Sequence, residues 1–394
     1  MPQPAAFTPI QRYQRISIID ILRGWALLGV VLMNYIDYYY MGLDFSKVKM
    51  DAVANVLQGI SSLVFQAKSW TMLSFLFGYG FAVLMQNVAN KGINPYTFFS
   101  KRMFWLFVLA IINSSFFWGD ILKDYAVMGM VLLLFYRSSA KTAFIISLVL
   151  LVSIPAVQAY VNTLQQSGGM ELMKPDFPLY KSGNILKVLW FGLLGTYKTE
   201  ILSMGYLVTV HVVMLTCFFL GLAAQKTGFF TRLAENRKYL KRIFLISLGA
   251  ALAIIGLFIT MNMLKIKDPF KYYNPWYLFV LSSMVFFMSA ICRLYLAGKL
   301  KALFYSLEMI GKMTLTNYMV QNFLGIFLFS GVGFSLSLGH KVHFGYYLLM
   351  ALVIYIIQVY FSKWWLSKYN YGPVEWLWRQ LSYGKKLPLK KASD

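Results

Sequence analysis

The sequence has very little charge. Charged residues make up only 13% of the 394 residues, whereas hydrophobic residues make up 59% and aromatic residues 18%. A soluble domain of this length needs more charge on its surface than this composition supplies. Apolar runs of about 20 residues recur along the whole chain, and a helix of that length crosses the hydrocarbon core of a bilayer. The composition therefore excludes a large soluble domain and predicts a membrane protein.

Cysteine and histidine are also scarce. The two cysteines, Cys217 and Cys292, both lie in apolar runs, which excludes a disulfide framework and a zinc cluster. The three histidines, His211, His340 and His343, lack a metal-binding spacing such as His-Glu-x-x-His. We therefore expect no metal site and no permanently bound cofactor.

Several motifs of soluble enzymes and pumps are missing. The chain has no phosphate-cradling Gly-Lys-Ser loop, no dinucleotide fingerprint and no Gly-x-Ser-x-Gly elbow. These absences argue against an ATP-driven pump and a serine hydrolase. No repeat of one half of the chain in the other is visible, which counts mildly against the internally duplicated transporter folds.

The apolar runs predict an all-α, polytopic transmembrane helix bundle in a single integral membrane domain, residues 1–394. We expect a polar arm at 1–17, a basic tail at 367–394, and a long loop at 162–201 with an interfacial or re-entrant helix. A shorter loop at 41–59 contains Asp44 and Asp51. The predicted spans, about ten, are 18–40, 60–86, 101–118, 121–136, 142–161, 202–224, 243–264, 275–297, 308–330 and 344–366.

Basic residues predict the orientation. The net charge of +23 is scattered over short loops rather than gathered in a stripe, which argues against nucleic acid as a partner. With ten spans both termini lie on one side. The loops of that side hold 24 Lys and Arg against 12 on the other, and every arginine outside the first span lies in the richer set. The positive-inside rule then predicts that both termini are cytoplasmic, so the long loop at 162–201 is not.

The first span, "SIIDILRGWALLGVVLMNYID", contains polar residues that a membrane helix would normally lack. At about 100° per residue, Asp20, Asn34 and Asp37 all fall within about 60° of Arg23. They form one polar stripe that we expect to face the protein interior. Asp20 and Arg23 can pair near the cytoplasm, either as an interface anchor or in a functional role. Charged groups inside a bilayer often mark pathways or sites.

Further candidates lie in other spans. In the second, Trp70 follows Gln66 and precedes Ser74 at four-residue spacing, which favours either helix packing or a site. In "WGDILKDYAVMG", Asp120 and Asp124 are four residues apart at the non-cytoplasmic end. Such carboxylates can share a proton, bind a cation or act as base and orienter, or they can simply be solvated acids.

Amide and imidazole side chains complete the set. Thr314, Asn317 and Gln321 share one face of the ninth span, where they can join helices or orient a ligand. His211 lies well inside the sixth span. A lone intramembrane histidine is most often a packing residue. Of the three histidines, however, His211 is the one placed to act deep in the bundle. It is therefore a candidate for proton transfer.

Several stretches resemble the bacterial YeiB family of inner-membrane proteins. They are "DILRG", "LSFLFGYGFA", "WGDILKDYAVMG", "IGKMTLTNYMVQN" and "YGPVEWLWRQLSYG", and they run in order across nearly the whole chain. The resemblance implies a bacterial cytoplasmic (inner) membrane. The Asp-x-x-Arg-Gly of the first helix, with a later Asn, is also similar to the transmembrane acyltransferases that include heparan-α-glucosaminide N-acetyltransferase.

That second similarity implies a function. Those enzymes move an acyl group from cytoplasmic acyl-CoA to a sugar hydroxyl or amine across the membrane. By this resemblance Asp20, Arg23 and Asn34 line the channel for the acyl donor, and the acceptor is a glycan or lipid of the envelope. The polar groups gather near one end of the spans, which favours a one-sided enzyme over a permease with a midplane site. A permease and a non-catalytic scaffold stay open as alternatives, and so does the oligomeric state.

The sequence departs from the family pattern at the general base. Family members often carry a His shortly before the Trp-x-Gly-Asp element, and this chain has Asn113 there. The acetyltransferases also use a His after the first helix, and residues 38–60 contain none. An amide cannot take up a proton as a general base. Either a carboxylate such as Asp37 or Asp120 acts as the base, or the chain is not an active transferase. In the first case Arg23 binds the phosphates of the donor.

The tail "YNYGPVEWLWRQLSYGKK" is predicted to dock against the helix ends rather than to lie loose. Trp376 and Trp378 are interfacial anchors, and the closing lysines favour anionic lipid. Glu375 is expected to pair with Arg379 four residues on.

Overall fold

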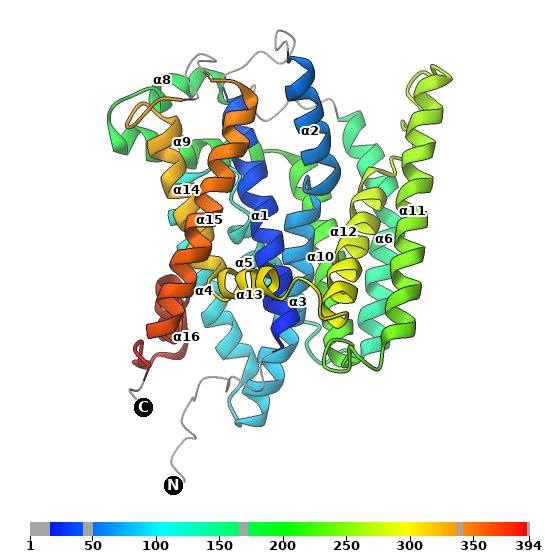
Figure 1. The fold of residues 1–394 in the computed structure, drawn as a ribbon, viewed down its shortest axis with the longest axis vertical. Helices are drawn as coiled ribbons and strands as arrows, with labels where there is room; N and C mark the ends of the chain where they lie inside the picture. Colours follow the sequence, from blue (N-terminus) through cyan, green and yellow to red (C-terminus); the bar gives the residue numbers. More distant parts are fainter. Residues whose placement is uncertain (1–15, 42–49, 165–171, 337–341, 392–394) are drawn as a thin grey trace.

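A computed structural model describes residues 16–41, 50–164, 172–336 and 342–391, which are helical with no β-strand among them (Figure 1). Its elements are α1 (Ser17–Tyr40), α2 (Ala52–Val64), α3 (Lys68–Asn90), α4 (Pro95–Phe116), α5 (Leu122–Leu133), α6 (Ala140–Thr163), η3 (Lys174–Asp176), α8 (Phe177–Tyr180), α9 (Ile185–Thr196), η4 (Tyr197–Ile201), α10 (Met204–Lys226), α11 (Arg237–Met263), α12 (Trp276–Leu296), α13 (Lys301–Gly311), α14 (Thr314–Phe329), α15 (Phe344–Lys368) and α16 (Pro373–Tyr383).

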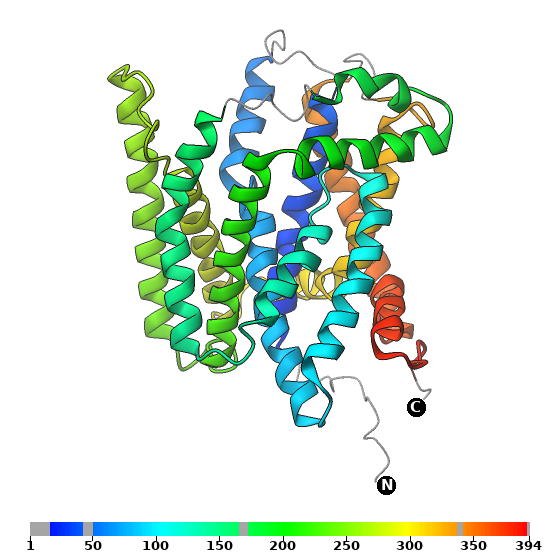
Figure 2. The same ribbon diagram turned by 180° about the vertical axis from the view of Figure 1, so that it is seen from behind.

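Most of these helices are membrane spans. Eight helical segments are long and apolar enough to cross a bilayer, with α2 and α3 together forming one of them. Two shorter helices, α5 with 12 residues and α14 with 16, run alongside the long ones (Figures 1 and 2). The prediction of an all-α bundle is confirmed, and about ten spans are consistent with it. The chain is a multi-pass membrane protein.

Several predicted boundaries are wrong. The span predicted at 308–330 begins inside α13, which ends at Gly311, and α14 begins only at Thr314. Residues 52–59 were expected in a loop, but they form the start of α2, where the Asp51 side chain accepts a hydrogen bond from the backbone N–H of Ala54. Asp44 lies outside the described residues. The span predicted at 121–136 is also shorter, since α5 ends at Leu133. Its start lies below the level of α9, and α9 with η4 crosses over one end of the bundle (Figure 2).

Small residues let the central helices approach closely. A Cβ on Gly78 of α3 would lie 2.1 Å from the carbonyl oxygen of Phe218, and a Cβ on Gly221 of α10 would lie 2.0 Å from that of Phe75. The Gly24 that follows Arg23 in α1 similarly faces the backbone of α13, which crosses α1 (Figure 1). In membranes, where lipid removes much of the hydrophobic drive, such backbone contacts are a main source of helix association.

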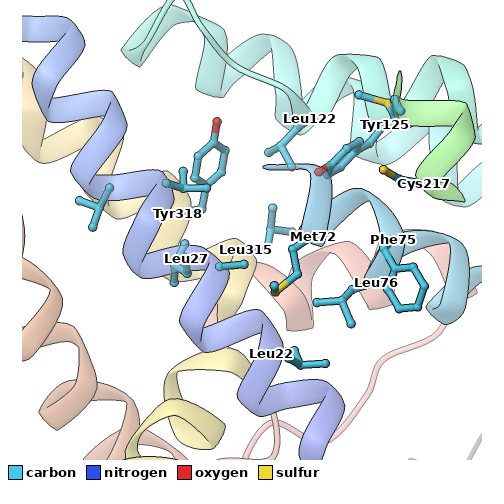
Figure 3. Close-up of a cluster of buried hydrophobic side chains, with 14 of the residues drawn as sticks. Leu22, Leu27, Met72, Phe75, Leu76, Leu122, Tyr125, Cys217, Leu315 and Tyr318 are labelled. Atoms are coloured by element: carbon cyan, nitrogen blue, oxygen red, sulfur yellow. The ribbon is translucent and has the colours of Figure 1, made fainter. Parts of the chain in front are cut away.

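Part of the buried core lies where α1, α3, α5, α10 and α14 meet. Their apolar side chains turn toward one another there (Figure 3). This packing brings the start of α5 next to α14 and α10, although they are distant in the sequence. The labelled members in Figure 3 are Leu22, Leu27, Met72, Phe75, Leu76, Leu122, Tyr125, Cys217, Leu315 and Tyr318.

The tail is docked, as predicted, but through different contacts. Glu375 of α16 accepts hydrogen bonds from the backbone N–H groups of Leu315 and Thr316 at 2.8 and 3.1 Å, so it caps α14. Its predicted pairing with Arg379 is therefore wrong, because α14 takes up its carboxylate. The indole Nε1 of Trp378 donates to the backbone oxygen of Arg102 at 3.0 Å and fastens α16 to α4.

Candidate functional site

The polar residues of α1 lie in three different environments. Asp20 is buried and accepts a hydrogen bond from Arg23 Nη1 at 2.8 Å, so the expected pair forms. Asn34 is buried too, and its Nδ2 donates to Asn322 Oδ1 of α14 at 3.1 Å. Asp37 is exposed and has no hydrogen-bond or ion-pair partner among the described residues. The stripe thus carries an ion pair at one end and an accessible carboxylate at the other.

Asp120 is held entirely inside the protein. Its side chain accepts hydrogen bonds from Asn113 Nδ2 at 2.7 Å and Tyr318 OH at 3.1 Å, with Ser114 Oγ at 3.5 Å. The residue is 0% exposed, which excludes a solvated acid at the surface. Burial raises the pKa of Asp120 to about 6. Asn113, at the place of the family histidine, therefore orients this carboxylate.

Lys123 is the centre of a second group of charges. Its Nζ donates to the backbone oxygen of Asp120 at 2.8 Å and to Asp124 Oδ2 at 2.9 Å, and it forms a short ion pair with Glu200 of η4. All four residues are buried. Desolvation raises the pKa of Glu200 to about 8, and the charge of Lys123 opposes part of that rise.

Asp124 also orients a histidine. Its Oδ1 lies 3.0 Å from Nε2 of His211, and its Oδ2 accepts a hydrogen bond from Tyr206 OH at 3.0 Å. The side chain of His211 is 19% exposed, whereas that of Asp124 is 6% exposed. The imidazole therefore lies at the accessible edge of the charged cluster, by which we mean Lys123, Asp124, Glu200, Tyr206 and His211.

The hydrogen bonds determine which nitrogen of His211 can act. A carboxylate oxygen accepts and does not donate, so Nε2 of the neutral ring carries the hydrogen. The lone pair then lies on Nδ1, which points away from Asp124. An imidazole held in one tautomer by a carboxylate is the arrangement that general-base catalysis requires. His211 of α10 is thus placed in this arrangement with Asp124.

The amides of α14 act mainly as helix contacts. Gln321 Nε2 donates to Gln358 Oε1 of α15 at 2.7 Å, and Asn317 Nδ2 donates to Ser362 Oγ at 3.0 Å. These side chains are buried, and their bonds join α14 to α15. Of the two roles that the sequence left open, the structure supports joining of helices for both residues.

Trp70 contributes its backbone rather than its ring. Its carbonyl oxygen accepts hydrogen bonds from Tyr125 OH at 3.0 Å and from Ser74 Oγ at 2.8 Å. The indole lies edge-on to Tyr277 of α12, with 6.4 Å between the ring centroids. This segment therefore ties α3 to α5 and α12. Among the described residues, no side-chain hydrogen bond joins Trp70 to the charged cluster.

Sequence reasoning missed three members of the charged cluster. Lys123 stands between the two aspartates of "GDILKD", and a lysine in an apolar run is itself a signal for a site. Glu200 and Tyr206 had no such signal, since they belong to a loop and to the start of a span. Tyr318, which donates to Asp120, was hidden among the apolar residues of α14.

Comparisons with known proteins bear on the family. Residues 224–385 match the family described as "Protein of unknown function (DUF418)". The chain is 28% identical to the uncharacterized protein YxaH of Bacillus subtilis, over 98% of this chain and 99% of the relative. It is equally similar to an uncharacterized 39.9 kDa protein of the amylase 3' region of Bacillus acidopullulyticus, 28% identical with the same coverage. The uncharacterized protein YeiB of Escherichia coli is 25% identical over 94% of this chain and 96% of its own. The resemblance to the YeiB family is confirmed.

Proposed function

We propose that this YeiB-like chain is a membrane-embedded acyltransferase in which His211 and Asp124 form the general-base pair. The observation that carries the proposal is the 3.0 Å contact between His211 Nε2 and Asp124 Oδ1 at the accessible edge of a buried charged cluster. It replaces the base that the sequence lacks at Asn113. Asp120 becomes a positioning residue, because its Oδ1 accepts from Asn113 and Tyr318 and its Oδ2 from Ser114.

The reaction is transfer of an acyl group from a thioester to a hydroxyl or amine. Nδ1 of His211 accepts the proton of the acceptor as its oxygen or nitrogen attacks the thioester carbonyl. The tetrahedral intermediate collapses, the carbon–sulfur bond breaks, and the protonated imidazole returns the proton to the leaving thiolate. Asp124 stabilises the imidazolium between these steps. The products are the acylated acceptor and free coenzyme A.

The donor and acceptor approach from opposite ends of α1. Acyl-CoA would enter from the end that carries Arg23, and Asp37, about 21 Å further along α1 at 1.5 Å per residue, would contact the acceptor. Arg23 already has Asp20 as its counter-charge, which weakens its attraction for phosphate. Asn34, held by Asn322, would form the wall of the channel between these ends.

The proposed setting is the cytoplasmic membrane of a bacterium, with both termini in the cytoplasm. The start of α1 and the docked α16 lie toward one end of the bundle, and α9 lies across the other (Figure 1). A donor from the cytoplasm would then meet the end with α16, and a glycan or lipid acceptor would meet the end with α9. The lipid bilayer surrounds the spans.

The proposal is tested by thiol release and label transfer. Purified protein in nanodiscs is mixed with radiolabelled acetyl-CoA and a membrane-lipid and glycan extract. We expect label in the acceptor fraction, and we expect His211→Gln to lower the rate at least about 100-fold, the typical contribution of a general base. The matched control is His343→Gln, because His343 pairs with Asp51 at 3.0 Å on the exposed surface. Equal rates in both variants would reject the assignment.

A permease is the second candidate, and one observation favours it. Lys123 lies buried between Asp124 and Glu200 in the bundle, and such ionisable groups are also typical of proton-coupled transport. The same labelled substrates, supplied to the protein in proteoliposomes, separate the two. An acyltransferase releases free thiol in proportion to labelled acceptor, whereas a permease would move the labelled compound into proteoliposomes without release of thiol.

A further inference from the structure

Two arginines of the bundle lack a carboxylate partner. Arg102 of α4 and Arg379 of α16 form no ion pair or side-chain hydrogen bond with any described residue, and Nη1 of Arg102 is buried without a partner. The guanidinium of Arg102 lies 3.6 Å from the ring centre of Trp378, and that of Arg379 lies 4.7 Å from the ring centre of Tyr371. We call these two residues the arginine pair.

The two cations are close enough to repel each other. The charge of Arg379 acts unfavourably on Arg102, whose guanidinium stacks on the ring of Trp378. Residues 91–105 and 376–391 contain no aspartate or glutamate that could compensate. Glu375, on the first turn of α16, is bound to α14 instead. This part of the described chain therefore has no built-in counter-ion.

Other contacts hold the arginine pair in place. Trp378 donates its Nε1–H to the backbone oxygen of Arg102 at 3.0 Å, so the same indole fixes the helix and covers the guanidinium. Lys101 lies at the other end of α16, where its Nζ would be 3.1 Å from a Cβ on Gly384. Arg23, by contrast, has its own aspartate at 2.8 Å. The arginine pair therefore combines two neighbouring cations with a buried guanidinium nitrogen that has no partner.

We propose that the arginine pair binds a phosphate group of a ligand between α4 and α16. A phosphate oxygen pair accepts two N–H bonds from one guanidinium, and the anion removes the repulsion between the two cations. The ligand is a phosphate ester, either the phosphates of coenzyme A or the headgroup of an anionic phospholipid. This inference does not depend on the proposed function, because the site would bind phosphate even if His211 transferred no acyl group.

The test uses the full chain in a non-ionic detergent and two probes. Coenzyme A is titrated by calorimetry, and phosphatidylglycerol is titrated by native mass spectrometry. We expect saturable binding of at least one probe. Arg102→Gln and Arg379→Gln should each weaken that binding at least tenfold, and Arg379→Lys should weaken it less, since a lysine keeps the charge but loses the planar fork.

The matched control is Arg242→Gln, since Arg242 is an exposed arginine near the start of α11. Its binding constants should stay within twofold of the parent. If Arg102→Gln fails to fold, the comparison of Arg379→Gln with Arg242→Gln decides, because Arg379 lies on the outer helix. Binding of coenzyme A identifies the donor as the source, and binding of phosphatidylglycerol identifies the membrane. Failure of both probes to bind, or equal binding by all variants, would overturn the proposal.

Discussion

At the scale of the residue, hydrogen-bond partners distinguish two buried aspartates that the sequence treats alike. Asp120 and Asp124 are four residues apart in one motif, yet Asp120 is enclosed by Asn113 and Tyr318 while Asp124 meets His211. The Asp20–Arg23 pair could be predicted, because a spacing of three places side chains on one helix face. The partners Tyr206 and His211 of Asp124 could not, because both come from α10, more than 80 residues away along the chain.

Lys123 should be essential for stability. Lys123→Met removes the cation that Asp124 and Glu200 share, and loss of one partner of a buried ion pair typically costs about 3–5 kcal/mol. Thermal unfolding in detergent measures the loss. The double variant Lys123→Met/Glu200→Gln should recover part of it, since one buried carboxyl is then permanently neutral. A single variant as stable as the parent would show that the lysine is not the centre of the cluster.

Glu200 should make stability depend on pH. Burial raises its pKa to about 8 from the ordinary 4.5, so the folded protein holds the proton more tightly than the unfolded chain does. The contribution of Glu200 to the free energy of unfolding is then full below about pH 4.5 and is lost as the pH rises through about 8. The temperature of thermal unfolding should therefore fall over that pH range, and Glu200→Gln should flatten the decline. An identical decline in the variant would contradict the assignment.

At the scale of the element, periodicity predicted the helices and missed how some of them end. The long apolar runs became α1, α6, α10 and α11 close to their expected limits. The turn before α5 could not be foreseen, because it is held by contacts from α9 and α14. The docking of α16 followed from its tryptophans, but the partner of Glu375 depended on which helix begins nearby.

The contact of α3 with α10 predicts a sharp difference between two glycines. Gly221→Ala places a Cβ 2.0 Å from the backbone oxygen of Phe75, so the helices must move apart. We expect a loss of about 1–3 kcal/mol, as for an overpacked core. Gly249→Ala in α11 is the matched control, since nothing lies within 4 Å of its added Cβ, and it should be neutral or stabilising. Thermal unfolding of both variants gives the comparison, and equal effects would argue against close packing of α3 and α10.

At the scale of the whole molecule, the two ends of the bundle differ both in basic residues and in the helices that cover them. The basic loops, the arginine pair and α16 lie toward one end, while α9 covers the other (Figure 2). Spans and their order could be predicted, since length and hydropathy determine them. The way in which α10 brings His211 to Asp124 could not, since it depends on contacts between distant segments.

The central claim is transfer of an acyl group from the end with α16 to the end with α9, and sidedness tests it most directly. Radiolabelled acetyl-CoA is supplied to sealed inverted vesicles, whose outer face is the cytoplasmic face, and to sealed right-side-out vesicles that contain the same protein. We predict labelled acceptor inside the inverted vesicles, none in the right-side-out vesicles, and none in either with His211→Gln. Label in both orientations, or label that persists with His211→Gln, would contradict the account.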